Sequence, residues 1–77
     1  MPLYRVERRD GENTVVNALR MIEDAGELIF QAPRGDGQWK TNYRIEESEV
    51  KAVARRVTEV GGSVRWVPAL PRLKAEV

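Results

Sequence analysis

Five basic side chains are the residues of this chain whose chemistry points most directly to binding. Four lie in segments predicted to be strands and one in a predicted loop, and they are Arg5, Lys40, Arg44, Arg65 and Arg34. Guanidinium and ammonium groups bind phosphate and carboxylate oxygens, so this set predicts contact with a nucleic-acid backbone or with an acidic protein surface. The whole chain carries 13 basic and 12 acidic residues, so the prediction depends on how the charges segregate rather than on net charge.

The residue types that most enzymes use are missing. The sequence has no histidine and no cysteine, which removes the commonest general base, the commonest metal ligand and every thiolate mechanism. The acidic cluster Glu46, Glu47 and Glu49 is expected to stabilise a helix start, because carboxylates are favourable at that end of the helix dipole. No serine has a base beside it, and no glycine-rich segment matches a phosphate loop. We therefore predict a protein that is not an enzyme, with no catalytic residue, no metal site and no cofactor.

Two tryptophans are the second candidate feature. Trp39 and Trp66 each lie near the end of a predicted strand. One interpretation places them at the rim of a thin core, where large aromatic side chains are common. The other makes them anchors for a partner surface, where tryptophan is enriched.

Short segments of alternating hydrophobicity must position these residues. Alternation predicts strands over residues 3–9, 27–32, 38–45 and 63–67. Apolar residues at helical spacing predict two helices. The first begins after Asn13 or Thr14 and ends at Gly26, and the second begins after Ser48 and ends at Gly61.

This order of elements is typical of the split βαβ, or ferredoxin-like, sandwich, an α+β fold with two helices on one face of a four-stranded antiparallel sheet. We predict one such βαββαβ domain over residues 1–70 and a loose C-terminal tail over 71–77. The segment Tyr4-Arg5-Val6-Glu7 recurs as Tyr43-Arg44-Ile45-Glu46. In the predicted fold both copies lie on central strands, with Tyr and Val or Ile under the helices and the two arginines side by side on the open face.

The predicted open face of the sheet is basic. It collects Arg5, Glu7, Ile29, Gln31, Lys40, Asn42, Arg44, Arg65 and Val67. Either this face contacts a partner, or its long side chains only cover a solvated sheet. The architecture is similar to that of RNA-recognition motifs, but no aromatic side chain points outward from the two central strands. Base stacking on this face is therefore not expected.

Residues 18–47 support a second fold hypothesis. They resemble the recognition helix and wing of a winged helix-turn-helix DNA-binding domain, in the order helix, apolar segment, Gly-Asp-Gly and Tyr-Arg-Ile. Such a domain needs two further helices upstream, and the chain has too few residues there to form them.

These observations favour a small non-enzymatic binding protein that acts by protein–protein interaction. In size and expected fold class the chain resembles small phage-borne inhibitors of host machinery, including some anti-CRISPR proteins, and this resemblance is one of architecture alone. Nucleic-acid binding through the basic face is the alternative. No apolar segment is long enough to span a membrane and the N-terminus lacks a signal-peptide pattern, so we expect a cytoplasmic protein without membrane contact. We expect a monomer or a homodimer formed through an edge strand.

Overall fold

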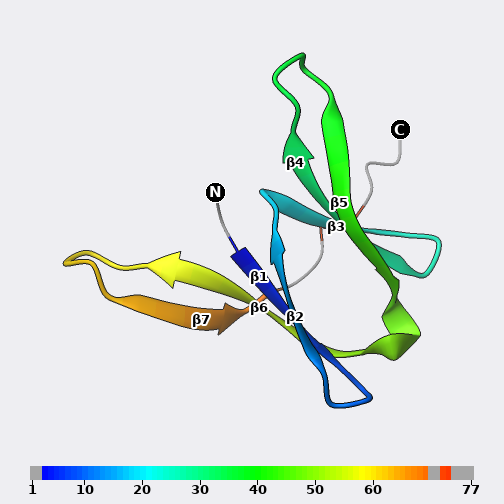
Figure 1. Cartoon of the computed structure of the whole chain (residues 1–77), viewed down its shortest axis with the longest axis horizontal. Coiled ribbons are helices and arrows are strands. Elements are labelled where there is room, and N and C mark those ends of the chain that lie inside the picture. Colours follow the sequence, from blue (N-terminus) through cyan, green and yellow to red (C-terminus); the bar gives the residue numbers. More distant parts are fainter. Residues whose placement is uncertain (1–2, 70–71, 74–77) are drawn as a thin grey trace.

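Two β-sheets build this chain in a computed structural model that describes residues 3–69 and 72–73 (Figure 1). Sheet A has the strand order β2-β1-β6-β7, and sheet B has the order β5-β4-β3-β8. The strands of sheet A are β1 (Leu3–Arg8), β2 (Asn13–Asn17), β6 (Val50–Thr58) and β7 (Val64–Pro68). Those of sheet B are β3 (Arg20–Asp24), β4 (Glu27–Pro33), β5 (Trp39–Glu46) and the two-residue β8 (Arg72–Leu73). Neighbouring strands are antiparallel except β8, which runs parallel to β3.

The prediction of a ferredoxin-like α+β sandwich is therefore wrong. Within the described ranges the only helical element is η1, a single 3₁₀ turn over Glu47–Glu49 that joins β5 to β6. The four predicted strands are present as β1, β4, β5 and β7, with no end shifted by more than one residue. Both predicted helices are strands instead, and each of these errors has its own physical cause.

The second predicted helix is β6, and a β-bulge explains its misleading spacing. Val6 faces Val53 and Arg8 faces Val50, so Lys51 is an extra residue on β6 where the register shifts. A bulge changes the parity of a strand, because two residues there oppose one residue of the partner. The bulge therefore places Val50 and Val53, three residues apart, on one face. With Val57 they reproduce the spacing of a helical stripe.

The first predicted helix is two strands, β2 and β3, that belong to different sheets. The chain leaves sheet A at Ala18 and enters sheet B at Arg20. Val16 is buried whereas its neighbour Val15 is 58% exposed, as expected for alternate faces of a strand. Gly26, predicted to end the helix, is the second residue of the two-residue β3–β4 hairpin turn.

The winged-helix hypothesis is also wrong, because the segment assigned to its recognition helix forms β3.

Strand pairing also corrects the expected arrangement of the repeated segment. β1 and β5, which hold Arg5 and Arg44, lie in different sheets. β7 is an edge of sheet A, whereas β4 is interior to sheet B.

The core lies between the two sheets. Sheet A contributes Tyr4, Val6 and Val16, while sheet B contributes Met21, Leu28, Phe30 and Ile45, all of them buried. Asn42 is the extra residue of β5 at a second register shift, and its Nδ2 donates a hydrogen bond to the Asn17 carbonyl (2.6 Å). This bond joins the side of β5 to the end of β2. The inward positions predicted for Tyr4 and Val6 of β1 and for Tyr43 and Ile45 of β5 are confirmed, although the two strands lie in different sheets. Trp39 was predicted to share the inward face of Tyr43, but the register shift at Asn42 places it on the opposite face of β5.

Two hairpins extend beyond the core. The β6–β7 and β4–β5 hairpins point away from the centre in different directions (Figure 1), in a flat molecule of 39 × 35 × 20 Å. The expected tail begins at residue 71, and of it only Arg72 and Leu73 lie within the described residues, as β8. The division into a domain over 1–70 and a loose tail stays a prediction. In the described part of the chain no helix has the length and apolar character needed to cross a membrane.

Candidate binding surface

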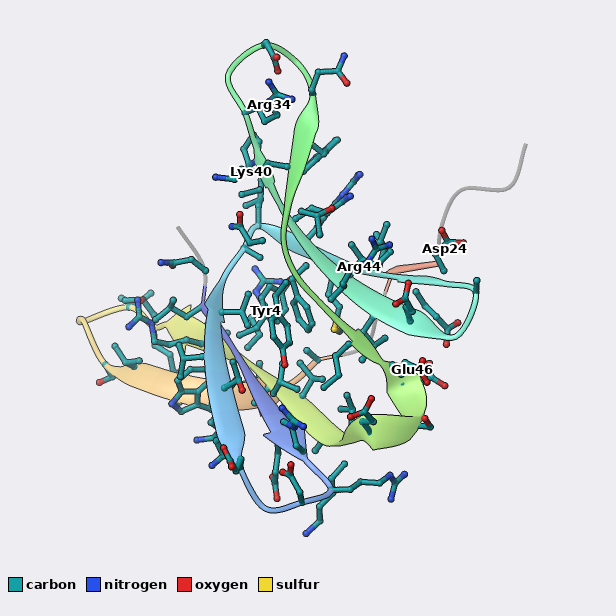
Figure 2. The ribbon with its side chains drawn as sticks, turned by 45° about the vertical axis from the view of Figure 1, so that its right-hand side comes forward. Tyr4, Asp24, Arg34, Lys40, Arg44 and Glu46 are labelled. Atoms are coloured by element: carbon teal, nitrogen blue, oxygen red, sulfur yellow. The ribbon has the colours of Figure 1, made fainter. Side chains whose placement is uncertain are left out.

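The five predicted basic residues are distributed over both sheets. Arg5 lies on β1 and Arg65 on β7 of sheet A, whereas Arg34, Lys40 and Arg44 follow the β4–β5 hairpin of sheet B. Figure 2 shows Arg34 at the loop of that hairpin, Lys40 below it, and Arg44 nearer the centre of the molecule. They share no single sheet face. The expectation of one basic open face is therefore wrong, as is the fold on which it depended.

Three of these five side chains form ion pairs within the chain. Arg34 pairs with Asp36 at 3.5 Å, Arg44 with Glu27 at 3.3 Å, and Arg65 with Glu59 at 3.4 Å. All three pairs are substantially exposed, so each contributes little to stability. Their charges are nevertheless balanced locally. Arg5 and Lys40 have no carboxylate partner among the described residues.

Charge is segregated between the sheets rather than between two faces of one sheet. Residues 3–17 and 50–69, which form sheet A and its turns, hold seven basic side chains (Arg5, Arg8, Arg9, Lys51, Arg55, Arg56, Arg65) and four acidic ones (Glu7, Asp10, Glu12, Glu59). Residues 20–49, which form three strands of sheet B and η1, hold four basic and seven acidic side chains. The sheet A half is therefore positive by three charges and the other half negative by three. The electrostatic field of the sheet A half therefore favours anionic groups over cationic ones.

Each tryptophan has an arginine stacked on its ring. The guanidinium carbon of Arg5 lies 4.8 Å from the ring centroid of Trp66 in sheet A. In sheet B the guanidinium carbon of Arg20 lies 3.7 Å from the Trp39 centroid, and Arg20 Nε also donates to Gln31 Oε1 (2.8 Å). Such contacts contribute about 0.5–1 kcal/mol at exposed sites and hold the arginine in one orientation.

Sheet A has an outer face that turns away from the core. Strand parity and register place side chains of all four strands on it, among them Arg5, Glu7, Val15, Ala52, Ala54, Arg56, Val64, Trp66 and Pro68. We call this set the outer face of sheet A. Val15 and Val64 are 58% and 54% exposed, and Trp66 is half-buried. Apolar side chains with charged residues beside them are typical of a protein-interaction surface.

A hollow of about 240 Å³ lies in this face. Its lining includes Arg5, Glu7, Trp66 and Pro68 around the two small residues Ala52 and Ala54. Arg5 faces Ala54, which in turn faces Pro68 across the next pair of strands. The hollow exists because β6 has only methyl groups where its neighbours have large side chains.

The second hollow, where the β1–β2 turn meets η1, is a weaker candidate. It is lined by Arg8, Arg9, Asp10, Ser48 and Glu49. Arg8 pairs with Asp10 at 3.2 Å and with Glu49 at 3.8 Å, and Arg9 Nε donates to the Ser48 carbonyl at 3.0 Å. The cations of this hollow are already engaged by the chain itself.

Within the acidic residues 20–49, the carboxyl of Glu23 has a perturbed pKa. The pKa of Glu23 is raised because its carboxyl hydrogen-bonds to that of Glu47 and because the two like charges repel each other. Figure 2 shows Glu46 and Asp24 on the same side of the molecule. No cluster of three or more acidic side chains suited to holding a metal ion was found over residues 3–69.

Several residues of the outer face were missed by the sequence analysis. Val15 lies in the segment predicted to be the first helix and Arg56 in the segment predicted to be the second, so neither was expected on a sheet face. The available signal was the high content of valine in both segments, because β-branched residues favour strands over helices. Helical spacing outweighed that signal.

Comparison with known proteins gave no match among protein-family models, curated proteins or solved structures.

Proposed function

We propose that this chain is a small non-enzymatic binding protein and that it contacts a protein partner through the outer face of sheet A. The observation that carries the proposal is that this face presents the exposed side chains of Val15 and Val64 together with the half-buried Trp66, which lines an open hollow. Solvation of such side chains is unfavourable by about 25 cal/mol per Å² of apolar surface, so covering them drives association. The proposed similarity to phage-borne inhibitors rested on an α+β sandwich and is not carried forward.

The test compares three forms of the tagged chain on a lysate of the cells from which the sequence derives. The forms are the wild type, a Val64→Ser/Trp66→Ala double variant, and Leu19→Ser as a control. Leu19 is exposed in the β2–β3 connection and lies outside the outer face of sheet A. We expect one stoichiometric partner that the wild type and the control retain and the double variant loses. Equal retention by the double variant, or the absence of any stoichiometric partner, contradicts the proposal.

Nucleic-acid binding is the second candidate, and the β6–β7 hairpin is the observation that favours it. Residues 50–69 carry four basic side chains and one acidic side chain. A two-stranded β-ribbon fits the major groove of DNA. Titration of single-stranded and duplex DNA at low and high salt tests this, because phosphate contacts release counterions and weaken with salt. If Arg56→Glu binds DNA with the same affinity as the wild type, nucleic-acid binding through this hairpin is contradicted.

The expected homodimer also stays a proposal. β7 is an edge strand, as such a dimer needs, but Pro68 has no N–H to donate and shortens the edge available for pairing. The mass in solution, measured by light scattering over a range of protein concentrations, distinguishes a monomer from a dimer.

A further inference from the structure

We propose that the hollow beside Trp66 is a carboxylate-binding subsite that receives an aspartate or glutamate side chain of a protein partner. The inference rests on the proposed function, because it concerns the same face of sheet A. It adds the chemistry of the group that enters the hollow. It also names the residues that bind the carboxylate: Arg5, which lines the hollow, and Arg56, which lies outside the lining but pairs with Trp66 in the register of β6 and β7.

The first step is the unbalanced charge of two arginines. Within residues 3–69, Arg5 has a contact with the Trp66 ring but no carboxylate partner, and Arg56 has no ion pair. Arg56 lies directly opposite Trp66 on the neighbouring strand. Both guanidinium groups are therefore on the tryptophan's face of the sheet without an anion of their own. A bidentate carboxylate is the protein group that fits a guanidinium fork best.

The second step concerns Glu7, the one acidic residue that lines the hollow. Its Oε2 lies 3.6 Å from Nζ of Lys51, the bulged residue of β6, so its charge is balanced by that lysine. The surrounding half of the molecule is positive by three charges. An incoming carboxylate therefore meets an attractive potential rather than the field of Glu7.

The third step is the preorganisation of the hollow. Stacking on Trp66 holds Arg5 in place before any partner arrives, which reduces the entropy lost on binding. The floor is made by Ala52 and Ala54, and Pro68 lines the side next to Trp66. Apolar walls lower the local dielectric constant and strengthen a charge-assisted hydrogen bond inside them. They also fit an apolar side chain that precedes or follows the acidic residue.

The shape of the site favours a protein segment over a nucleic acid. At about 240 Å³ the hollow holds one or two side chains. Arg5 covers one face of the Trp66 ring, which reduces the aromatic surface available for stacking of bases. The exposed valines Val15 and Val64 suit a partner with apolar groups beside its carboxylate. A phosphate backbone supplies no such groups.

The experiment uses a random peptide library displayed on phage and selected on the full-length chain. Three baits are compared: the wild type, Arg5→Gln/Arg56→Gln, and Arg55→Gln as the matched control. Arg55 is also exposed and has no ion pair with another described residue, but it lies on the opposite face of β6. Selected peptides are then titrated and followed by the NMR signal of the Trp66 indole N–H. The indole N–H of Trp39 in sheet B is the internal reference.

We expect the wild type and the control to select peptides with an acidic residue next to an apolar one. We expect these peptides to shift the indole N–H signal of Trp66 and to leave that of Trp39 unchanged. We expect the double variant to bind them at least about tenfold more weakly, which corresponds to about 1.4 kcal/mol. Replacing the acidic residue of the peptide by its amide should have the same effect.

Three outcomes overturn the subsite. If selected peptides shift the indole N–H signal of Trp66 but carry no acidic residue, the proposal that the hollow binds a carboxylate is wrong, while the proposal that this face binds protein stands. If no selected peptide shifts Trp66, both this subsite and the proposed face are contradicted. If DNA shifts Trp66 and every peptide fails to do so, the site binds phosphate rather than a carboxylate side chain.

Discussion

Tyr4 and Phe30 meet edge to face across the two sheets, with ring centroids 5.3 Å apart and an interplanar angle of 64°. Tyr43 approaches the same phenylalanine from the neighbouring strand of sheet B, at 5.9 Å. The two tyrosines of the repeated segment thus converge on one ring from two sheets. This aromatic cluster is the centre of the core.

Phe30→Ala should be the most damaging single substitution in the chain. Phe30 is fully buried, and truncation of a buried phenylalanine costs about 3–5 kcal/mol. Domains of this size have only a few kcal/mol of stability, so we expect the variant to be largely unfolded by circular dichroism. Phe30→Leu should remain folded with a lower urea midpoint. Val15→Ala, at an exposed position, serves as the control, and a Phe30→Ala variant of wild-type stability contradicts this account of the core.

Ala25→Asn should stabilise the protein. Ala25 has φ of 54° and Gly26 has φ of 81° in the two-residue β3–β4 turn. A turn with positive φ at both positions favours Asn-Gly, because a Cβ makes the left-handed region unfavourable for most residues. We expect the free energy of unfolding to rise by about 0.5–1 kcal/mol in urea titrations. Ala25→Val should lower it, and a gain in that variant argues against the assigned turn.

Asn42→Ala should loosen the join between the sheets. The substitution removes the hydrogen bond from Asn42 Nδ2 to the Asn17 carbonyl and should cost about 0.5–1.5 kcal/mol. Hydrogen exchange should become faster at the ends of β2 and β5 before it changes in β1. Thr41→Ala, at the exposed neighbouring position, is the matched control. Uniform acceleration across both sheets points instead to a global loss of stability.

Glu23→Gln should change how stability depends on pH. The pKa of Glu23 is raised by its hydrogen bond to Glu47 and by repulsion between the two carboxylates. A raised pKa in the folded state means that the pair favours folding at low pH and loses this contribution as pH rises through that pKa. The uncharged glutamine keeps a donor for Glu47 and removes the repulsion.

We therefore expect Glu23→Gln to be more stable than the wild type at neutral pH, with a difference that vanishes on acidification below the ordinary pKa of glutamate. Urea midpoints over a pH series measure this, and Glu12→Gln in the β1–β2 turn is the control. If the stability difference between Glu23→Gln and the wild type grows on acidification, the pH dependence has the opposite sign and contradicts a raised pKa of Glu23.

Part of this structure follows from the sequence alone. Alternation over residues 3–9 placed Tyr4 and Val6 in the core and Arg5 outside it, and the structure confirms all three positions. Arg34 was predicted to lie in a loop, and the structure confirms it, because residues 34–38 join β4 to β5. These features depend on neighbours within a few residues, so local sequence is sufficient to determine them.

Only the tertiary structure decided whether the valine-rich segments are helices or strands. The spacing of Val50, Val53 and Val57 fits a helix, and it equally fits a strand with a bulge at Lys51. The bulge is set by pairing with Arg8, more than 40 residues away in the sequence. The contact of Arg5 with Trp66 depends on the same pairing, because β6 lies between their strands. Strand pairing is non-local, so the candidate binding site exists only once the chain has assembled sheet A.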